Sequence, residues 1–265
     1  MSKKNIVYWC GVKPEDDRVS TRFKYGDYEW MEYSKKTWEY WCKKNGVEFV
    51  HYDKPSRPDQ MRYKINWQRW FDIFDYIGDD YKSVLTVDAS IMIRWDCPNL
   101  FDLASWGTML LRNDENWRWT YESAKGYEDM FPDVKFSHKD YFASGFFMFN
   151  RKSAYLIEQL KEFFFEHEEE ILKREDETVL RGRDQPILNY IVQRDRRPMT
   201  HWDVGLVGNH LYRKEVLQGN WQLNDPMPFF IKYFKVWIFS GFSDRGETRT
   251  RLMKSTWDIV KENYV

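Results

Sequence analysis

Short apolar runs alternate with segments of helical periodicity over the first 90 residues. In the helical segments bulky apolar residues recur every three or four positions, and each segment ends at a glycine, Gly46 or Gly78. The predicted strands are 6–12, 47–52 and 83–87, and the predicted helices are 28–45 and 67–77. Because strands that alternate with helices form parallel sheets, we predict an α/β fold with a mostly parallel central sheet and helices on both faces.

The remaining chain has a weaker pattern. Residues 106–132 mix aromatic and polar side chains without a clear period, which predicts an irregular excursion or lid. Strand-like aromatic residues return at 141–150, and the next segment has the period of one long amphipathic helix over about 153–173. A last short strand is predicted at 235–239. Because the chain has neither an internal repeat nor a low-complexity linker, we expect it to fold as one domain.

Composition narrows the class of protein. The 265-residue chain is 42% apolar and 19% aromatic, which supplies a sizeable core and excludes wholesale disorder. Lysine and arginine number 41 against 42 aspartates and glutamates, so no overall field directs the chain to nucleic acid or to an anionic membrane. Its apolar runs are far shorter than the about 18 residues of a membrane span, so we expect no transmembrane segment.

Several familiar motifs are missing from the sequence. The three cysteines form no CxxC pair, and no Asn-x-Ser/Thr site occurs, which favours a reducing, cytoplasmic location. The chain also lacks GxGxxG, GxxxxGKS/T, GxSxG and HExxH. We therefore expect neither a phosphate loop, nor a nucleophile elbow, nor the zinc-binding helix of a metalloprotease.

Two positions are candidates because of their place beside predicted elements. Asp88 is the first polar residue after the buried run 84–87, and ligands of α/β sheets bind at the carboxyl ends of the strands. Asp184 and Gln185 precede Pro186, which suits the first turn of a helix and leaves both side chains free to face a cleft. A turn or helix-cap role is the alternative for both aspartates.

Four segments occur in an order that is typical of one enzyme group. They are Val84–Leu103 with Val-Asp-Ala-Ser at 87–90, Tyr141–Asn150 with Ala-Ser-Gly at 143–145, Arg183–Asn189 with Asp-Gln at 184–185, and Lys235–Gly241. Together they resemble GT-A fold glycosyltransferases, most closely the retaining, glycogenin-like and galactosyltransferase-like enzymes of glycosyltransferase family eight. The resemblance covers about residues 6–241 and depends on the order and spacing of the segments.

The resemblance implies a single Rossmann-like GT-A domain over residues 1–265. Its expected parts are a nucleotide-sugar-binding half (1–104), an irregular excursion or lid (105–140), an acceptor-side half (141–241) and a basic C-terminal tail (242–265). The implied activity is transfer of a sugar from a nucleotide donor, a UDP-sugar, to an unidentified hydroxyl acceptor. The anomeric configuration would be retained.

The resemblance also assigns roles to single residues. The nucleotide-sugar-binding candidates are Arg69, Asp88, Ser90, Ser144, Gly145 and Arg245, and the catalytic candidates are Asp184 and Gln185. Asp88 would contact the ribose of the donor or a bound metal ion. Asp184 and Gln185 would lie against the transferred sugar near the reacting carbon. Because the Gln185 amide is no general base, the leaving diphosphate itself would accept the proton of the acceptor hydroxyl.

Two departures from the family pattern concern the metal ion. Ser90 stands where the family has the second aspartate of its Asp-x-Asp motif, and Ile238 stands where it has a metal-binding histidine. Asp88 would then be the one family ligand left, so a weak, donor-dependent Mg²⁺ or Mn²⁺ site is kept as an alternative. We expect arginines to neutralise the leaving diphosphate instead. The candidates are Arg69, Arg245, Arg249 and Arg251.

Two other functions remain open at the level of the sequence. The replaced metal ligands also suit a non-catalytic relative that binds sugars or nucleotides. A phage-type enzyme that transfers a sugar to modified bases in DNA is the other alternative, with the basic run 194–197 and the tail on the phosphates. The near-neutral net charge speaks against a broad DNA-binding surface.

Overall fold

The computed structural model describes residues 3–13, 28–55, 65–104, 109–112, 117–177, 182–195, 200–202, 227–240 and 247–265. Within these residues, the centre is a six-stranded sheet in the order β2-β1-β3-β6-β5-β7. The strands are β1 (Lys4–Cys10), β2 (Glu48–Tyr52), β3 (Tyr81–Asp88), β5 (Met109–Arg112), β6 (Phe142–Asn150) and β7 (Thr200–Trp202). β1 pairs in parallel with β2 and β3, and β5 with β7, whereas β6 is antiparallel to both of its neighbours. The mostly parallel sheet is therefore confirmed.

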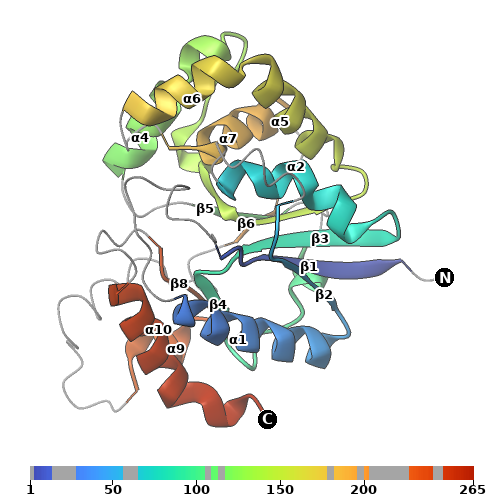
Figure 1. Ribbon diagram of the computed structural model, residues 1–265, viewed down its shortest axis with the longest axis vertical. Helices are drawn as coiled ribbons and strands as arrows, with labels where there is room; N and C mark the ends of the chain where they lie inside the picture. Colours follow the sequence, from blue (N-terminus) through green and yellow to red (C-terminus); the bar gives the residue numbers. More distant parts are fainter. Residues whose placement is uncertain are drawn as a thin grey trace.

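Helices cover both faces of this sheet (Figure 1). On one side lie α2 (Ile65–Ile77), α4 (Trp117–Lys125), α5 (Tyr155–Glu166), α6 (Glu168–Glu177) and α7 (Asp184–Asp195). On the other side α1 (Glu29–Asn45) packs against α10 (Glu247–Val260). The shorter helices are α3 (Leu100–Leu103), α9 (Phe229–Tyr233), η3 (Glu128–Met130), η4 (His138–Asp140) and η6 (Lys261–Asn263). Two helical layers around one sheet confirm the predicted α/β architecture.

Alternate residues of β1 belong to two separate hydrophobic cores. Ile6 and Tyr8 lie in one core with the buried residues of α2, whereas Val7 and Trp9 lie in the other core with those of α1. This division follows from the two-residue period of a strand, which directs successive side chains to opposite faces. Because both faces are covered, the strand reads as a continuous apolar run in the sequence.

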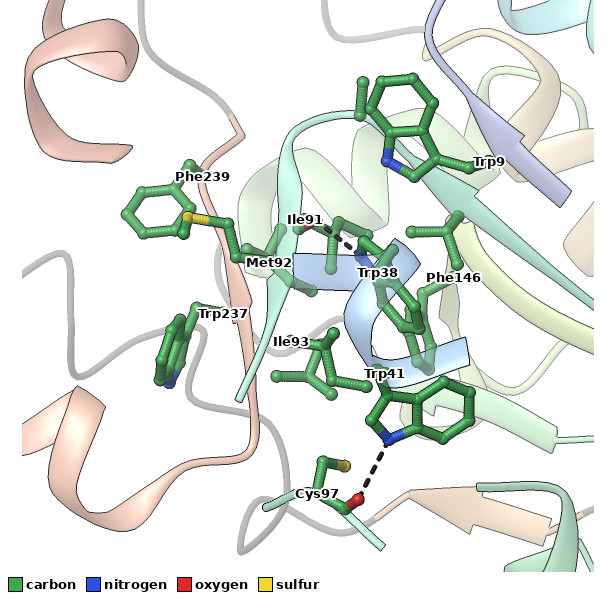
Figure 2. Close-up of a cluster of buried hydrophobic side chains, with 14 of the residues drawn as sticks. Trp9, Trp38, Trp41, Ile91, Met92, Ile93, Cys97, Phe146, Trp237 and Phe239 are labelled. Carbon is green, nitrogen blue, oxygen red and sulfur yellow. Dashed lines mark hydrogen bonds between the residues drawn. The ribbon is translucent and has the colours of Figure 1, made fainter. Parts of the chain in front are cut away.

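A second, two-stranded sheet lies on the α1 side of the molecule. β4 (Ile91–Ile93) pairs antiparallel with β8 (Val236–Ile238), the strand predicted at 235–239. Indole groups of α1 attach to this region, because Trp38 donates to the Ile91 carbonyl at 2.8 Å and Trp41 to the Cys97 carbonyl at 3.0 Å (Figure 2). The buried indoles thus satisfy backbone acceptors while they fill the core.

The two predicted helix stops are confirmed by the backbone. Gly46 follows α1 with a φ of 65°, and Gly78 follows α2 with a φ of 63°. Glycine adopts this left-handed conformation without the steric cost that a Cβ atom imposes. The glycines therefore end both helices where the next strands begin, at Glu48 and Tyr81.

The prediction of irregular structure over 106–132 is wrong. This segment contributes β5, which pairs with β6 and β7, and α4, which is a regular helix. The buried residues of α4 are Thr120, Ser123 and Ala124, which are small or polar. Because no bulky apolar residue is buried on this helix, the sequence gives no run of large apolar positions by which to recognise it.

The prediction of one long helix over 153–173 is also wrong. α5 ends at Glu166, and His167 has a non-helical φ of −119° and ψ of 22° before α6 begins at Glu168. α6 runs in a different direction from α5 (Figure 1). On α6, Arg174 donates to the Gly126 carbonyl at 2.8 Å and to the Asp129 carboxylate at 2.6 Å. These long-range contacts favour two helices over one, and the local apolar period does not reveal them.

The segment predicted as a basic tail contains a packed helix. α10 has buried side chains, among them Leu252 and Met253, that belong to the core on the α1 side. Among the described residues, no helix combines the length and the apolar content that crossing a membrane requires.

All three thiols are buried, and burial raises the pKa of each, to about 12 for Cys10 and Cys97. Below that pH the neutral thiol predominates, and the thiolate is the reactive form. We expect alkylation of the native protein at pH 8 to be at least about 10³-fold slower than that of an unfolded thiol. A colorimetric thiol assay with and without denaturant measures this, and rapid labelling of the native chain would contradict it.

Candidate functional site

Asp88 is the last residue of β3 and lies at the carboxyl end of the sheet. In the parallel register it is the partner of Cys10, the last residue of β1, and the following Ala89 N–H donates to the Cys10 carbonyl at 3.1 Å. Its side chain is 36% exposed. The structure therefore places the Asp88 carboxylate where α/β sheets bind their ligands, as the sequence predicts.

A buried arginine joins Asp88 to two of the other predicted residues. Arg69, on α2, donates from one terminal nitrogen to Asp88 Oδ1. Its other terminal nitrogen donates to Asp184 Oδ2 at 2.6 Å and to Ser144 Oγ at 3.1 Å. The four residues come from α2, β3, β6 and α7, so the cluster exists only when these elements are packed together.

The cluster carries two carboxylates for one guanidinium. Burial by itself lowers the pKa of Arg69, but attraction to Asp88 and Asp184 outweighs it, so that the pKa of Arg69 is raised. The Asp184 side chain is as buried as that of Arg69, at 2% exposure. Removing Asp88 would leave the charges of Arg69 and Asp184 balanced, but one terminal nitrogen of the buried guanidinium would lose its acceptor, which is costly.

Gly145 permits a close approach between β6 and Asp88. A Cβ atom at this position would lie 2.3 Å from Asp88 Oδ2 and 2.7 Å from Asp88 Cγ, well inside van der Waals contact. The glycine predicted to line the sugar pocket is therefore required here by the aspartate itself.

The Gln185 side chain is held at its oxygen, and its nitrogen lies near Tyr141. The Ser144 backbone N–H donates to Gln185 Oε1 at 3.1 Å. Gln185 Nε2 is buried, and no described residue lies in good hydrogen-bond geometry to it. The Gln185 side chain nevertheless acts on the buried Tyr141 hydroxyl, where it opposes the rise that burial causes in the pKa of Tyr141. A buried amide whose donor is not firmly engaged is a natural contact for a ligand oxygen.

Asn189 fixes the helix that carries Asp184 and Gln185. It accepts from the Phe142 N–H and donates to the Phe142 carbonyl, both at 2.9 Å, and its amide also donates to the Gln185 carbonyl at 2.8 Å. One side chain thus ties α7 to the first residue of β6. Asn189 is the last residue of the sequence motif, but its role is visible only once α7 and β6 are packed together.

Side chains of α2 bind the Asp184 carboxylate. Asp184 is the first residue of α7, and its Oδ2 atom accepts from the Trp70 indole at 2.8 Å as well as from Arg69. These contacts give the carboxylate a role beyond the end of its own helix. Trp70 is not among the residues predicted for the site, because its spacing on α2 is that of an ordinary core residue.

The two positions that depart from the family pattern lie side by side. The Phe239 N–H donates to the Ser90 carbonyl at 2.8 Å, and Ile238 pairs with Ile91 in the β4–β8 sheet. Within the described ranges no three His, Cys, Asp or Glu side chains are grouped as a metal site. Asp88, Ser90 and Ile238 therefore do not fit a divalent ion held by the protein.

The remaining arginine candidates lie outside the cluster or outside the described residues. Arg249 donates from Nε to the Phe239 carbonyl at 2.7 Å and covers the Trp30 ring, with 4.6 Å between Cζ and the ring centroid. Arg251 is exposed on α10, and Arg245 is not among the described residues. Arg249 therefore holds the end of β8 against α1.

Two solved structures match almost the whole chain. A glycosyltransferase involved in the glycosylation of the major capsid of PBCV-1 has a TM-score of 0.59 at 9% identity, over 95% of this chain and 99% of that chain. The galactosyltransferase LgtC, in complex with donor and acceptor sugar analogues, has a TM-score of 0.50 at 14% identity, over 95% of each chain. No family model and no curated protein matches the sequence. At such low identity, the likeness shows the fold.

We expect Gly145→Ala to destabilise the protein by about 1–3 kcal/mol, because the added methyl group displaces Asp88 from Arg69. An Asp88→Ala background removes the two nearest atoms and leaves the Cβ atom of residue 88 at 3.3 Å, so the same substitution should cost less than about 1 kcal/mol. Urea unfolding of the four proteins gives both values. An equal cost in the two backgrounds would mean that Gly145 is required by something other than Asp88.

Proposed function

Since the chain has the GT-A fold of glycosyltransferases, we propose that it transfers a sugar from a nucleotide donor, a UDP-sugar, to a hydroxyl acceptor with retention of configuration. The observation that supports this most is the gathering of Asp88, Gly145, Asp184 and Gln185 around Arg69. Three motifs distant in the sequence thus supply one site at the carboxyl end of the sheet.

In the proposed reaction, Asp88, Gln185 and Asp184 each make one hydrogen bond to the donor. The partly exposed Asp88 carboxylate would accept a hydrogen bond from a ribose hydroxyl of the donor. Gln185 Nε2 would donate to an oxygen of the transferred sugar or of the leaving group. Asp184 would accept from a sugar hydroxyl, which orients the reacting carbon.

The proposed transfer needs no protein side chain as a base. The bond between the anomeric carbon and the diphosphate oxygen breaks, and its electron pair stays on the diphosphate. The acceptor oxygen forms the new bond to the same face of that carbon, and its proton passes to the leaving diphosphate oxygen. The Gln185 amide takes no proton in this scheme and serves to hold the sugar.

The geometry changes the role that we propose for Arg69. Its two terminal nitrogens already bind Asp88, Asp184 and Ser144. We therefore propose that Arg69 holds the two carboxylates in place and does not bind the diphosphate itself. We propose that the arginines of the 245–251 segment, Arg245 among them, neutralise the leaving diphosphate, with a weak divalent ion on Asp88 and the diphosphate as the alternative.

A panel of UDP-sugars tests the activity, with free UDP as the readout. We expect one UDP-sugar to be consumed. Asp88→Ala should lower kcat/KM by about 100-fold, which is the effect of losing a hydrogen bond to a charged group. Asp96→Ala is the matched control, because Asp96 is an ion-paired aspartate bound by Arg94 at 2.9 Å and Lys235 at 2.7 Å outside the cluster. Near-normal turnover of Asp88→Ala would contradict the assignment, and binding without turnover of any donor would favour a non-catalytic protein.

Chelation tests the source of positive charge. Because Asp88 is the one carboxylate at the family's metal positions, we expect turnover to persist at least in part in excess EDTA, and Arg245→Ala to lower it further. Donor turnover is measured with EDTA alone and after addition of Mn²⁺. Complete loss in EDTA that Mn²⁺ fully restores would mean that other residues, such as Asp203 or Asp244, complete a metal site.

A further inference from the structure

Trp70 contacts the Asp184 carboxylate but has no role in the reaction proposed above. Its indole Nε1–H donates to Asp184 Oδ2 at 2.8 Å, and its side chain is fully buried. Arg69 donates to the same oxygen at 2.6 Å. Two donors occupy the acceptor directions of Oδ2, so a ligand hydroxyl that approaches Asp184 would meet Oδ1.

The Trp70 indole also contacts the Arg69 guanidinium, which donates to the same carboxylate. Arg69 Cζ lies 4.7 Å from the centroid of the Trp70 ring, within the range of a cation–π contact. The ring meets Phe147 of β6 edge-on, with 6.3 Å between the ring centroids. Trp70 is therefore held by packing, and it presents its face to the cation and its polar edge to the anion.

We propose that Trp70 is a positioning residue, which fixes the rotation of the Asp184 carboxylate so that Oδ1 faces the transferred sugar. The identity of the ligand rests on the proposed function, whereas the hydrogen bond rests on the geometry of α2 and α7. Without the indole N–H, Arg69 still holds one oxygen of the carboxylate, but a second hydrogen bond no longer fixes its rotation. A smaller share of the bound UDP-sugar then has the reactive orientation. We therefore expect kcat to fall more than the binding affinity for the UDP-sugar.

Trp67 supplies a matched control on the same helix. It lies one turn before Trp70, is fully buried, and donates from its indole Nε1 to Glu175 Oε1 at 2.6 Å. Trp67→Phe therefore removes the same chemical group, an indole N–H bound to a buried carboxylate, outside the Arg69 cluster. Its effect on folding should resemble that of Trp70→Phe, whereas its effect on turnover should not.

Turnover of a UDP-sugar by Trp70→Phe and Trp67→Phe, each in the wild type and in an Asp184→Asn background, tests the proposal. We expect Trp70→Phe to lower kcat by about 10-fold or more in the wild type, the effect of losing a hydrogen bond to a charged group. In the Asp184→Asn background it should add less than about 2-fold, because both changes act through one carboxylate. Trp67→Phe should change kcat by less than about 2-fold. An equal loss for Trp70→Phe in both backgrounds, or an equal loss for both tryptophan variants, overturns the proposal.

The indole N–H resonances of ¹⁵N-labelled protein provide a test that needs no turnover. Trp70→Phe and Trp67→Phe identify the two signals by their disappearance, and Asp184→Asn should shift the Trp70 signal while leaving that of Trp67 in place. An unshifted Trp70 signal overturns the proposal whatever the activity. If the wild type consumes no UDP-sugar, the proposed function fails, and the Trp70 signal still decides whether the hydrogen bond exists. Should Asp184→Asn not fold, the kcat ratio of the two tryptophan variants decides the test.

Discussion

Compensation of the buried Arg69 charge is the constraint on which the site depends. A guanidinium at 2% exposure has lost its hydration, and anions must replace that hydration for the fold to be stable. The anions come from the end of β3 and the start of α7, and a hydroxyl comes from β6. Docking of α2 on the sheet and assembly of the site are therefore the same event.

The aromatic core extends this coupling to the other face of the sheet. Trp38 and Trp41 of α1 donate to carbonyl groups at Ile91 and Cys97, while their rings fill the core. β4 in turn pairs with β8, so the turn after Asp88 is supported by residues more than a hundred positions later in the chain. Bulky indoles with one polar atom suit this task, because they add buried area and orient a backbone segment together.

The likeness to glycosyltransferases at 9% and 14% identity shows that chains with few identical residues adopt this fold. In this chain Ser90 and Ile238 join the packing of β4 and β8 and offer no carboxylate or imidazole.

The sequence by itself determined the first half of the sheet, its two helices, and the positions of Asp88, Ser144, Gly145, Asp184 and Gln185 in motifs, because period and turn residues are local properties. The tertiary structure alone decided the pairing of β5, the break at His167 and the partners of Arg69. Those partners lie up to 115 residues away along the chain, and Trp70 looks like an ordinary core residue until α7 packs beside it. A local pattern reports that a side chain is buried, whereas only the packed chain determines which charge or hydrogen-bond partner it meets there.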